Sequence, residues 1–374
     1  MKNRIVSLDY MRGVVIVLMA IDHASSAFNG GRFAADSHFF YRPGMELPVD
    51  QFLTRWITHL CAPAFLFLAG AALALSIERR VRDGHSNWSI NRRLLVRGSL
   101  IALLDVIWIS IFWAPGRILL QVLYAIGISM ILMIPLRTLS NRWLAGIAIG
   151  FFIGAESILN ALESSTDQST SVLLTLTLYP GLVDVFACLY PVLPWLAMMI
   201  LGWVFGRYLL TWWGTETTRR ALPVILSVVG VIALFLFVLL RGLNGYGNMA
   251  LLRDDSSLVQ WLLVSKYPPS LTFVLLEGGL IALVLGGLFW RENRRDKPMG
   301  RNHPLLVFGQ TSLFFYLLHI PILEVTARLF GLQKSAGLSM TYVAAAGVLI
   351  ALYPLCRWYR SYKRAHPNSP LQYI

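Results

Sequence analysis

The chain alternates long apolar stretches with short polar ones. Each apolar stretch approaches the roughly 20 residues that an α-helix needs to cross a hydrocarbon core about 30 Å thick. The stretches are unbroken blocks, whereas the strands of a membrane β-barrel would alternate apolar and polar residues. The pattern therefore predicts an all-α polytopic membrane bundle that forms one domain over residues 1–374. The ten predicted spans are 7–28, 52–77, 94–113, 117–136, 142–161, 188–210, 221–241, 268–290, 304–328 and 337–358.

Two parts of this pattern need a separate interpretation. The turn Ala114-Pro115-Gly116 divides the apolar run at 94–136 into two spans, because proline ends helices. The stretch 172–187 is only moderately apolar, and we expect a re-entrant or interfacial segment there.

The composition agrees with a membrane protein. Apolar residues make up 56% of the chain and charged residues 14%, whereas a soluble domain carries about 25% charge. This shortage of charge excludes a soluble enzyme, and the apolar content excludes a disordered chain. A disulfide scaffold is excluded as well, because the three cysteines are an odd number and lie far apart in apolar runs.

The distribution of Lys and Arg predicts the orientation. With a cytoplasmic N-terminus, 22 of the 32 basic residues fall in cytoplasmic segments and eight in outer segments. Cytoplasmic loops of membrane proteins carry such an excess, so both termini are predicted to be cytoplasmic. This bias accounts for most of the net charge of +13, and nucleic-acid binding is not needed to explain it.

A few charged or ionisable residues fall inside the predicted spans. A charge at the membrane centre costs about 2.5–3.5 kcal/mol on insertion scales, so such residues face the bundle interior and are candidate site residues. They are Asp9, Arg12, Asp22, His23, Arg55, His59, Asp105, Glu156, Glu277, His319 and Glu324.

Three of these residues are histidines that share a predicted depth. At a rise of about 1.5 Å per residue, His23 and His319 lie about 24 and 22 Å from the cytoplasmic side, and His59 lies about 10 Å below the outer surface. A functional layer in the outer half of the membrane is therefore predicted. The simpler interpretation is that each histidine hydrogen-bonds to a neighbouring helix.

Spacing within the spans adds further expectations. Arg55 and His59 are four residues apart and share a helix face, and Asp9 and Arg12 can form an ion pair. Asp22 and His23 are adjacent and cannot face each other, so Asp22 is expected to orient a different histidine. A carboxylate on one imidazole nitrogen makes the other nitrogen a better base.

Other features have structural interpretations. Gly202 and Gly206 form a pair typical of helix packing. The arginine runs at 79–97 and 291–301 are mainly topology signals, although they could also attract a phosphate-bearing ligand. No His and Cys occur at a zinc-binding spacing, so no metal is expected.

Several motifs lie in order along the chain. They are Ser-Leu-Asp-Tyr-Met-Arg-Gly at 7–13, Ile-Asp-His at 21–23, Thr-Arg-Trp-Ile-Thr-His-Leu-Cys-Ala-Pro at 54–63, Phe-Leu-Ala-Gly at 67–70, Tyr-Pro-Val-Leu-Pro-Trp at 190–195, Lys-Tyr-Pro-Pro-Ser at 266–270 and Phe-Tyr-Leu-Leu-His at 315–319. Together they resemble the bacterial branch of the heparan-α-glucosaminide N-acetyltransferase-like membrane family.

This resemblance implies transfer of an acetyl group across a membrane, from cytoplasmic acetyl-CoA as co-substrate to a glycan amine or hydroxyl outside. In the lysosomal relative, the active histidine lies between the first two spans in a Lys-His-Ala-Ser-Trp-Asn context that is absent here. His38 is the one histidine in the equivalent loop of this chain, whereas His23 and His59 stand in the shared motifs.

Such a reaction needs a base and a donor for the developing oxyanion. A histidine, with an ordinary pKa of about 6.5, suits the first role, and Arg55, Tyr316 or a protonated histidine suits the second. We therefore expect three groups of site residues. The expected catalytic residues are His23, His59, His319 and Asp22; the substrate contacts are Arg55, His38, Lys266, Tyr267, Glu277 and Tyr316; and the donor contacts are Asp9, Arg12 and Asp105.

Two other function classes stay open. Buried charges also suit a transporter or flippase of a glycan or lipid precursor, and a weaker alternative is a non-catalytic partner in an envelope-biosynthesis complex. The expected location is a bacterial inner membrane. The expected partners are membrane lipid and a sugar acceptor, with a homodimer left open and no nucleic acid.

Overall fold

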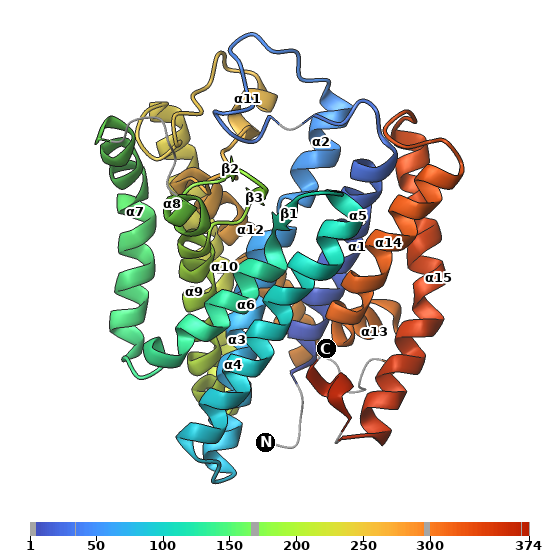
Figure 1. The fold of residues 1–374 in the computed structure, drawn as a ribbon. Coiled ribbons are helices and arrows are strands. Elements are labelled where there is room, and N and C mark those ends of the chain that lie inside the picture. The colour runs from blue at the N-terminus through green and yellow to red at the C-terminus, as the bar shows by residue number, and fades with distance from the viewer. Residues whose placement is uncertain (1–4, 34, 166–171, 295–299, 368, 374) are drawn as a thin grey trace.

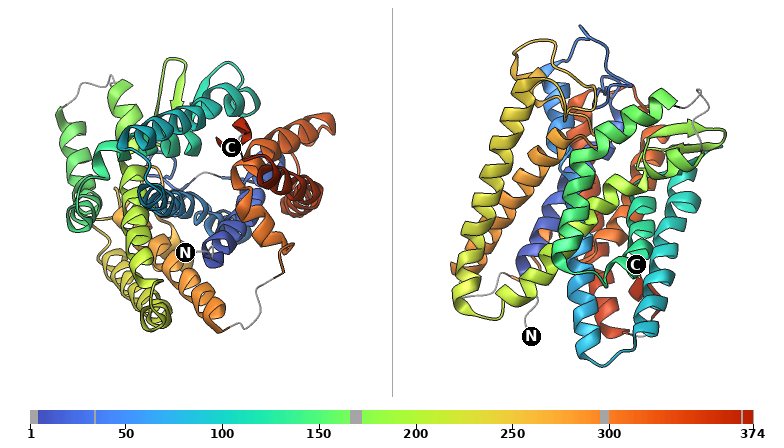
Figure 2. Two further views of the ribbon diagram at one scale, coloured as in Figure 1. Left: turned by 90° about the horizontal axis from the view of Figure 1, so that it is seen from below. Right: turned by 90° about the vertical axis from the view of Figure 1, so that its left-hand side faces the viewer.

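The computed structural model describes residues 5–33, 35–165, 172–294, 300–367 and 369–373. Within them, nine helical segments are long and apolar enough to cross a membrane, and the helices run side by side along one axis (Figures 1 and 2). The prediction of an all-α polytopic bundle is confirmed. Six of the nine segments are single helices: α1 (Val6–Phe28), α7 (Asn141–Ser165), α9 (Val192–Trp212), α10 (Glu216–Leu243), α12 (Leu271–Arg294) and α15 (Leu338–Ala365).

In α7, the part counted as spanning is Asn141–Leu162. The three remaining long segments are jointed or follow a break. They are α2 with α3 (Val49–Thr58 and Cys61–Arg82), α4 with the π-helical turn η1 and α5 (Asn87–Leu104, Asp105–Ile109 and Ser110–Trp113), and α14 (Ser312–Leu329), which follows α13 (Pro304–Gln310). We call the end where α3 meets α4 the inner end, since the charge pattern predicts it to face the cytoplasm.

The joint between α2 and α3 has a local cause. Pro63 has no backbone N–H, so the carbonyl of His59 four residues earlier loses its helical partner. At the same residue the hydrogen-bond spacing changes, because the backbone N–H of His59 donates to Trp56 O, three residues back rather than four, at 3.0 Å. The predicted span at 52–77 is therefore two helices that meet at His59 and Leu60.

Two other predicted spans need correction. The span at 117–136 begins as a short strand, β1 (Ile118–Leu120), and only α6 (Val122–Leu136) is helical, with 15 residues. The span at 304–328 is divided between α13 and α14 at Thr311, whose backbone leaves the helical conformation.

The stretch at 172–187 forms a short helix and two strands rather than one segment. It consists of α8 (Val172–Thr177) and β2 (Gly181–Val183), followed by β3 (Phe186–Cys188). β3 lies in the middle of a three-stranded sheet, parallel to β1 and antiparallel to β2. The remaining short elements are α11 (Leu258–Leu262) and η2 (Pro370–Tyr373).

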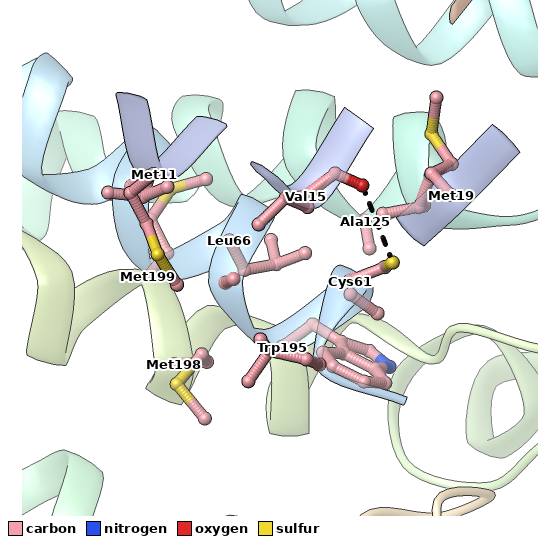
Figure 3. Close-up of a cluster of buried hydrophobic side chains, with 14 of the residues drawn as sticks. Met11, Val15, Met19, Cys61, Leu66, Ala125, Trp195, Met198 and Met199 are labelled. Carbon is pink, nitrogen blue, oxygen red and sulfur yellow. Dashed lines mark hydrogen bonds between the residues drawn. The ribbon is translucent and has the colours of Figure 1, made fainter. Parts of the chain in front are cut away.

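The core joins helices from both halves of the chain. α1 packs against α3, α12, α13, α14 and α15, and one cluster of buried apolar side chains runs through the bundle. Figure 3 shows part of it, where α1, α3, α6 and α9 meet. Its labelled side chains are Met11, Val15, Met19, Cys61, Leu66, Ala125, Trp195, Met198 and Met199.

Glycines allow the closest crossings of these helices. A Cβ atom on Gly202 would lie 1.9 Å from Phe67 O, and one on Gly206 would lie 2.6 Å from Ala71 O. The prediction that this glycine pair serves helix packing is confirmed, since any side chain there would push α9 away from α3.

Candidate functional site

Charged side chains from three parts of the chain meet near the outer end of the bundle. We call Asp22, Arg32, Asp36, Arg55 and His59 the outer polar cluster. Arg55 Nη1 donates to Asp22 Oδ1 at 2.8 Å, and its Nη2 donates to Asp36 Oδ2 at 2.6 Å. Arg32 Nη2 lies 3.0 Å from Asp22 Oδ1. One arginine thus joins a carboxylate of α1 to a carboxylate of the following loop.

His59 belongs to the same cluster through Asp36. Its Nε2 lies 3.1 Å from Asp36 Oδ2, and because a carboxylate only accepts here, Nε2 donates. Nδ1 of the neutral ring then carries the lone pair, and this buried atom has no hydrogen-bond partner in the described part of the chain. Burial alone would raise the pKa of Asp36, but the charge of Arg55 and the hydrogen bond from His59 hold that pKa well below its ordinary value.

His23 and His319 form a second arrangement, which we call the histidine pair. His23 Nδ1 lies 2.6 Å from His319 Nε2, and the two rings are stacked with centroids 4.9 Å apart. His319 Nδ1 lies 3.1 Å from the carbonyl oxygen of Phe315.

This geometry fixes the tautomers of the pair. A carbonyl can only accept, so His319 Nδ1 donates to Phe315 O, and His319 Nε2 of the neutral ring accepts from His23 Nδ1. The lone pair of His23 is therefore on Nε2, which lies 4.0 Å from Asp22 Oδ2. His23 Nε2 is the atom of the pair that can take up a proton.

A cavity of about 250 Å³ extends from the inner half of the bundle toward this pair. Arg12, Arg97 and Lys363 contribute its basic lining, and Tyr316 contributes to the lining at the other side. The Tyr316 ring is 6.0 Å from that of His23 and 5.5 Å from that of His319, measured between centroids. Most other lining residues are apolar side chains of α3, α4 and α6.

The structure brings together most of the residues predicted for catalysis. His23 and His319 are in direct contact, and His59 is connected to them through Asp36, Arg55 and Asp22 rather than by ring contact. The predicted ion pair between Asp9 and Arg12 is confirmed at 3.1 Å. The catalytic roles themselves stay predictions.

The prediction for Asp22 is wrong in two respects. It does not orient another histidine, because its carboxylate accepts hydrogen bonds from Arg55 and Thr58 and pairs with Arg32. It also does not point away from His23, its neighbour in sequence, since the two side chains approach to 4.0 Å. Asp36 orients His59 instead.

The other predicted substrate contacts lie around this region in different ways. His38 packs its ring against Phe39, with centroids 3.8 Å apart. Tyr267 OH lies 3.3 Å from Tyr190 OH. Lys266 and Glu277 are both buried, with exposed fractions of 2% and 1%.

Asp105 has a structural task at the start of α6. Its Oδ2 accepts from the backbone N–H of Gln121 at 2.9 Å and of Tyr124 at 2.6 Å, which satisfies donors that a helix start leaves free. It is not among the residues that line the cavity, and its predicted contact with the donor is untested.

Sequence reasoning missed four residues of this region: Asp36, Tyr190, Arg97 and Lys363. Asp36 lies in a loop, and Arg97 and Lys363 belong to basic segments that were interpreted as topology signals. Tyr190 stands in the motif Tyr-Pro-Val-Leu-Pro-Trp, and that motif was the signal that could have identified it. Among the described residues, no group of three His, Cys, Asp or Glu side chains gathers as a metal-ligand set.

Comparison with known proteins agrees with the motifs. Residues 4–241, well over half of the chain, match the family model of the heparan-alpha-glucosaminide N-acetyltransferase catalytic domain. A search of curated proteins finds no match. The matched segment contains the outer polar cluster and His23, whereas Lys266, Glu277, Tyr316 and His319 lie beyond it.

Proposed function

Because the chain belongs to the heparan-α-glucosaminide N-acetyltransferase catalytic family, which comprises transmembrane acetyltransferases, we propose that it moves an acetyl group from cytoplasmic acetyl-CoA to an amine or hydroxyl of a glycan on the outer side. The observation that supports this proposal best is the cavity, which runs from basic side chains in the inner half to Tyr316, whose ring lies 6.0 Å from that of His23.

The cavity suits the two chemically different parts of the donor. Arg97 makes no hydrogen bond within the described residues, and its Nε is buried without a partner. A guanidinium left unpaired at the inner side is available for the phosphates of acetyl-CoA. The apolar lining from Phe65, Leu123 and Ile126 suits the pantetheine chain.

His23 is the proposed base. Its Nε2 accepts the proton of the acceptor amine or hydroxyl as the new bond to the acetyl carbon forms and the carbon–sulfur bond breaks. The imidazolium then returns the proton to the CoA thiolate. His319 keeps His23 in the required tautomer, and the Asp22 carboxylate, 4.0 Å away, stabilises the positive charge.

Tyr316 is the proposed donor to the developing oxyanion. Its hydroxyl is buried and has no hydrogen-bond partner in the described structure, and its ring lies beside both histidines. Arg55 was another candidate, but two of its nitrogens already donate to carboxylates. A donor that is free before the reaction contributes most to oxyanion stabilisation.

The multi-pass topology agrees with a membrane location. We further propose that the protein lies in a bacterial inner membrane with both termini in the cytoplasm, because the basic residues concentrate at the inner end. The acceptor then approaches from the outer loops.

The test uses purified protein in detergent with radiolabelled acetyl-CoA and glucosamine. We expect His23→Gln to lower acetyl transfer by about 10²–10⁴-fold with unchanged binding of acetyl-CoA. His85→Gln, at an exposed histidine between α3 and α4, is the matched control and should behave as the parent. Absence of acetyl-CoA binding, or full transfer by His23→Gln, would overturn the proposal. Counterflow of a sugar in proteoliposomes without acetyl-CoA would instead support transport.

A further inference from the structure

Pro321 interrupts the hydrogen bonding of α14, the helix that contains Tyr316 and His319. Proline has no backbone N–H, so the carbonyl of Leu317, four residues earlier, receives no donor from its own helix. This carbonyl lies two residues before His319. The hydrocarbon core of a bilayer offers no water to satisfy a backbone carbonyl, so another part of the protein has to donate to it.

Trp108 supplies the missing donor. Its indole Nε1 donates to Leu317 O at 2.8 Å. Trp108 belongs to η1, the π-helical turn that follows α4. The hydrogen bond therefore joins two segments that are 209 residues apart in sequence, and it meets α14 within the helical turn that contains both Tyr316 and His319.

The π-helical turn explains how one short segment reaches two neighbours. In an α-helix, residues three apart lie on one face, so Asp105 and Trp108 would point to the same side. In η1 the backbone N–H of Ser110 donates to Asp105 O, five residues back, and the wider turn separates the two side chains. Asp105 binds the start of α6, whereas Trp108 binds α14. Single π-helical turns of this kind are frequent at functional sites.

The same segment also reaches the other member of the histidine pair. Trp113, the last residue of α5, packs its ring against that of His23, with centroids 4.6 Å apart and planes at 79°. Arg328 of α14 binds this end of α5, because its Nη2 donates to Phe112 O at 2.8 Å. The end of a helix leaves such a carbonyl without a helical partner. In Figure 1, α5 lies beside α14 near the outer end of the bundle.

The contact between the two histidines depends on where α14 lies. His23 Nδ1 is 2.6 Å from His319 Nε2, and a displacement of about 1 Å would exceed the range of a hydrogen bond. The bond from His319 Nδ1 to Phe315 O is internal to α14 and moves with that helix. The bond from Trp108, in contrast, joins α14 to a different element, so it can set the distance between the rings.

We propose that Trp108 is a positioning residue of acetyl transfer. Its bond to Leu317 O holds α14 where His319 Nε2 accepts from His23 Nδ1, and this leaves the lone pair of His23 on Nε2, which takes up the proton in the proposed reaction. Trp108 is not among the residues that line the cavity, so it acts through His319 and not on the donor. The assignment rests on the proposed function and adds to it a residue outside the reaction centre.

The first experiment compares kcat with acetyl-CoA binding for the full chain in detergent. Trp108→Phe keeps an aromatic ring and removes the N–H. Its kcat should fall about 10–100-fold, as expected for a displacement of about 1 Å at the reacting groups, while its Kd for acetyl-CoA stays at the parental value. Trp88→Phe is the matched control, because Trp88 lies on α4 with an exposed fraction of 75%; it should transfer acetyl as the parent does.

Pro321→Ala provides a background in which loss of the donor does not leave a carbonyl unsatisfied. Residue 321 then has a backbone N–H for Leu317 O, and a carbonyl has two lone pairs, so the bond from Trp108 can remain. Addition of Trp108→Phe should still lower kcat about 10–100-fold, with an unchanged midpoint of thermal unfolding. Equal kcat with and without Trp108→Phe in this background would mean that the indole only satisfies the carbonyl, and the positioning role would be overturned.

A double-mutant comparison tests whether Trp108 acts through His319. Trp108→Phe should cause no further loss of kcat in a protein that already contains His319→Gln, because both substitutions affect the same contact with His23. Losses that add fully would show that Trp108 acts by another route and would contradict the proposal.

Nitrogen NMR of protein labelled with ¹⁵N-histidine gives a measurement that does not depend on activity. In the parent, the protonated nitrogen of His23 should be Nδ1, with the signal assigned by its absence from His23→Gln. In Trp108→Phe, His23 should populate both tautomers, because its Nδ1 has lost a fixed acceptor. A parental tautomer together with parental kcat in Trp108→Phe would defeat this inference alone, whereas a parent that neither binds acetyl-CoA nor transfers acetyl defeats the proposed function.

Discussion

The outer polar cluster and the inner cavity use the same kind of side chain in opposite ways. Arg55, in the cluster, has an exposed fraction of 9% and donates to two carboxylates at 2.8 and 2.6 Å. Arg97, in the cavity wall, is half-buried and makes no hydrogen bond with the described residues. One arginine is paired with two carboxylates within the fold, and the other is available to a ligand.

The difference shows which residues should govern folding and which should govern binding. A buried ion pair that loses one partner leaves an uncompensated charge, so its removal destabilises strongly. An unpaired cation in a cavity contributes little to the folded state and gains energy when an anion arrives. Variants of the two arginines should therefore affect different measurements.

The largest effect is expected for Arg55→Ala. The substitution leaves Asp22 and Asp36 without their shared partner, and breaking a buried pair of this kind costs about 3–5 kcal/mol. Folding yield in detergent and the midpoint of thermal unfolding should both fall, and acetyl transfer should fall with them. Size-exclusion chromatography and a thermal-unfolding assay measure these changes.

Arg32→Ala is the control for this prediction. Arg32 pairs with Asp22 alone, and its side chain is 22% exposed, so a smaller loss is expected. If Arg55→Ala folds and transfers acetyl as the parent does, the outer polar cluster does not hold the site together.

Much of the fold follows from the sequence because apolar length is a strong signal. The six spans that form single helices depend only on hydrophobic length and on the positions of Lys and Arg. The errors arise at residues that act on the backbone locally. Pro63 divides one predicted span, and the pairing of β1 with β3, between segments far apart in sequence, leaves no local pattern to detect.

The site could be predicted in part for a similar reason. Depth along the helices placed His23 and His319 together, because helical rise is regular. The partner of His59 could not be found in this way, since Asp36 reaches it from a loop whose path depends on contacts such as the one with the backbone of Lys266. The tautomers also needed coordinates, because they depend on the carbonyl of Phe315.

An intermediate effect is expected for Arg97→Gln, which tests the other side of the comparison. Loss of one charge-assisted contact to a phosphate in a partly exposed site should raise the Kd for acetyl-CoA about tenfold. The stability of the protein and the kcat of acetyl transfer should stay at parental values. Arg137→Gln is the control, because Arg137 lies between the α3–α4 hairpin and α6 and does not line the cavity. An equal loss of acetyl-CoA affinity in this variant would mean that Arg97 acts only through the general positive field.

The smallest effect concerns the pH dependence of Asp36. Arg55, His59 and Lys266 face this carboxyl and, against the effect of burial, keep its pKa well below the ordinary value in the folded protein. Its contribution to stability is therefore complete above the ordinary aspartate pKa of about 3.9 and declines as the pH falls through the lower folded-state value. The difference in free energy of unfolding between the parent and Asp36→Asn should be constant from about pH 5 to pH 8, because the other titrating groups are the same in both proteins. This difference should narrow by about 1 kcal/mol by pH 3. Thermal unfolding of both proteins across this range measures the gap. A gap that widens in acid would mean that the Asp36 carboxyl is protonated in the folded state, and Asp36 would then not form the ion pair with Arg55.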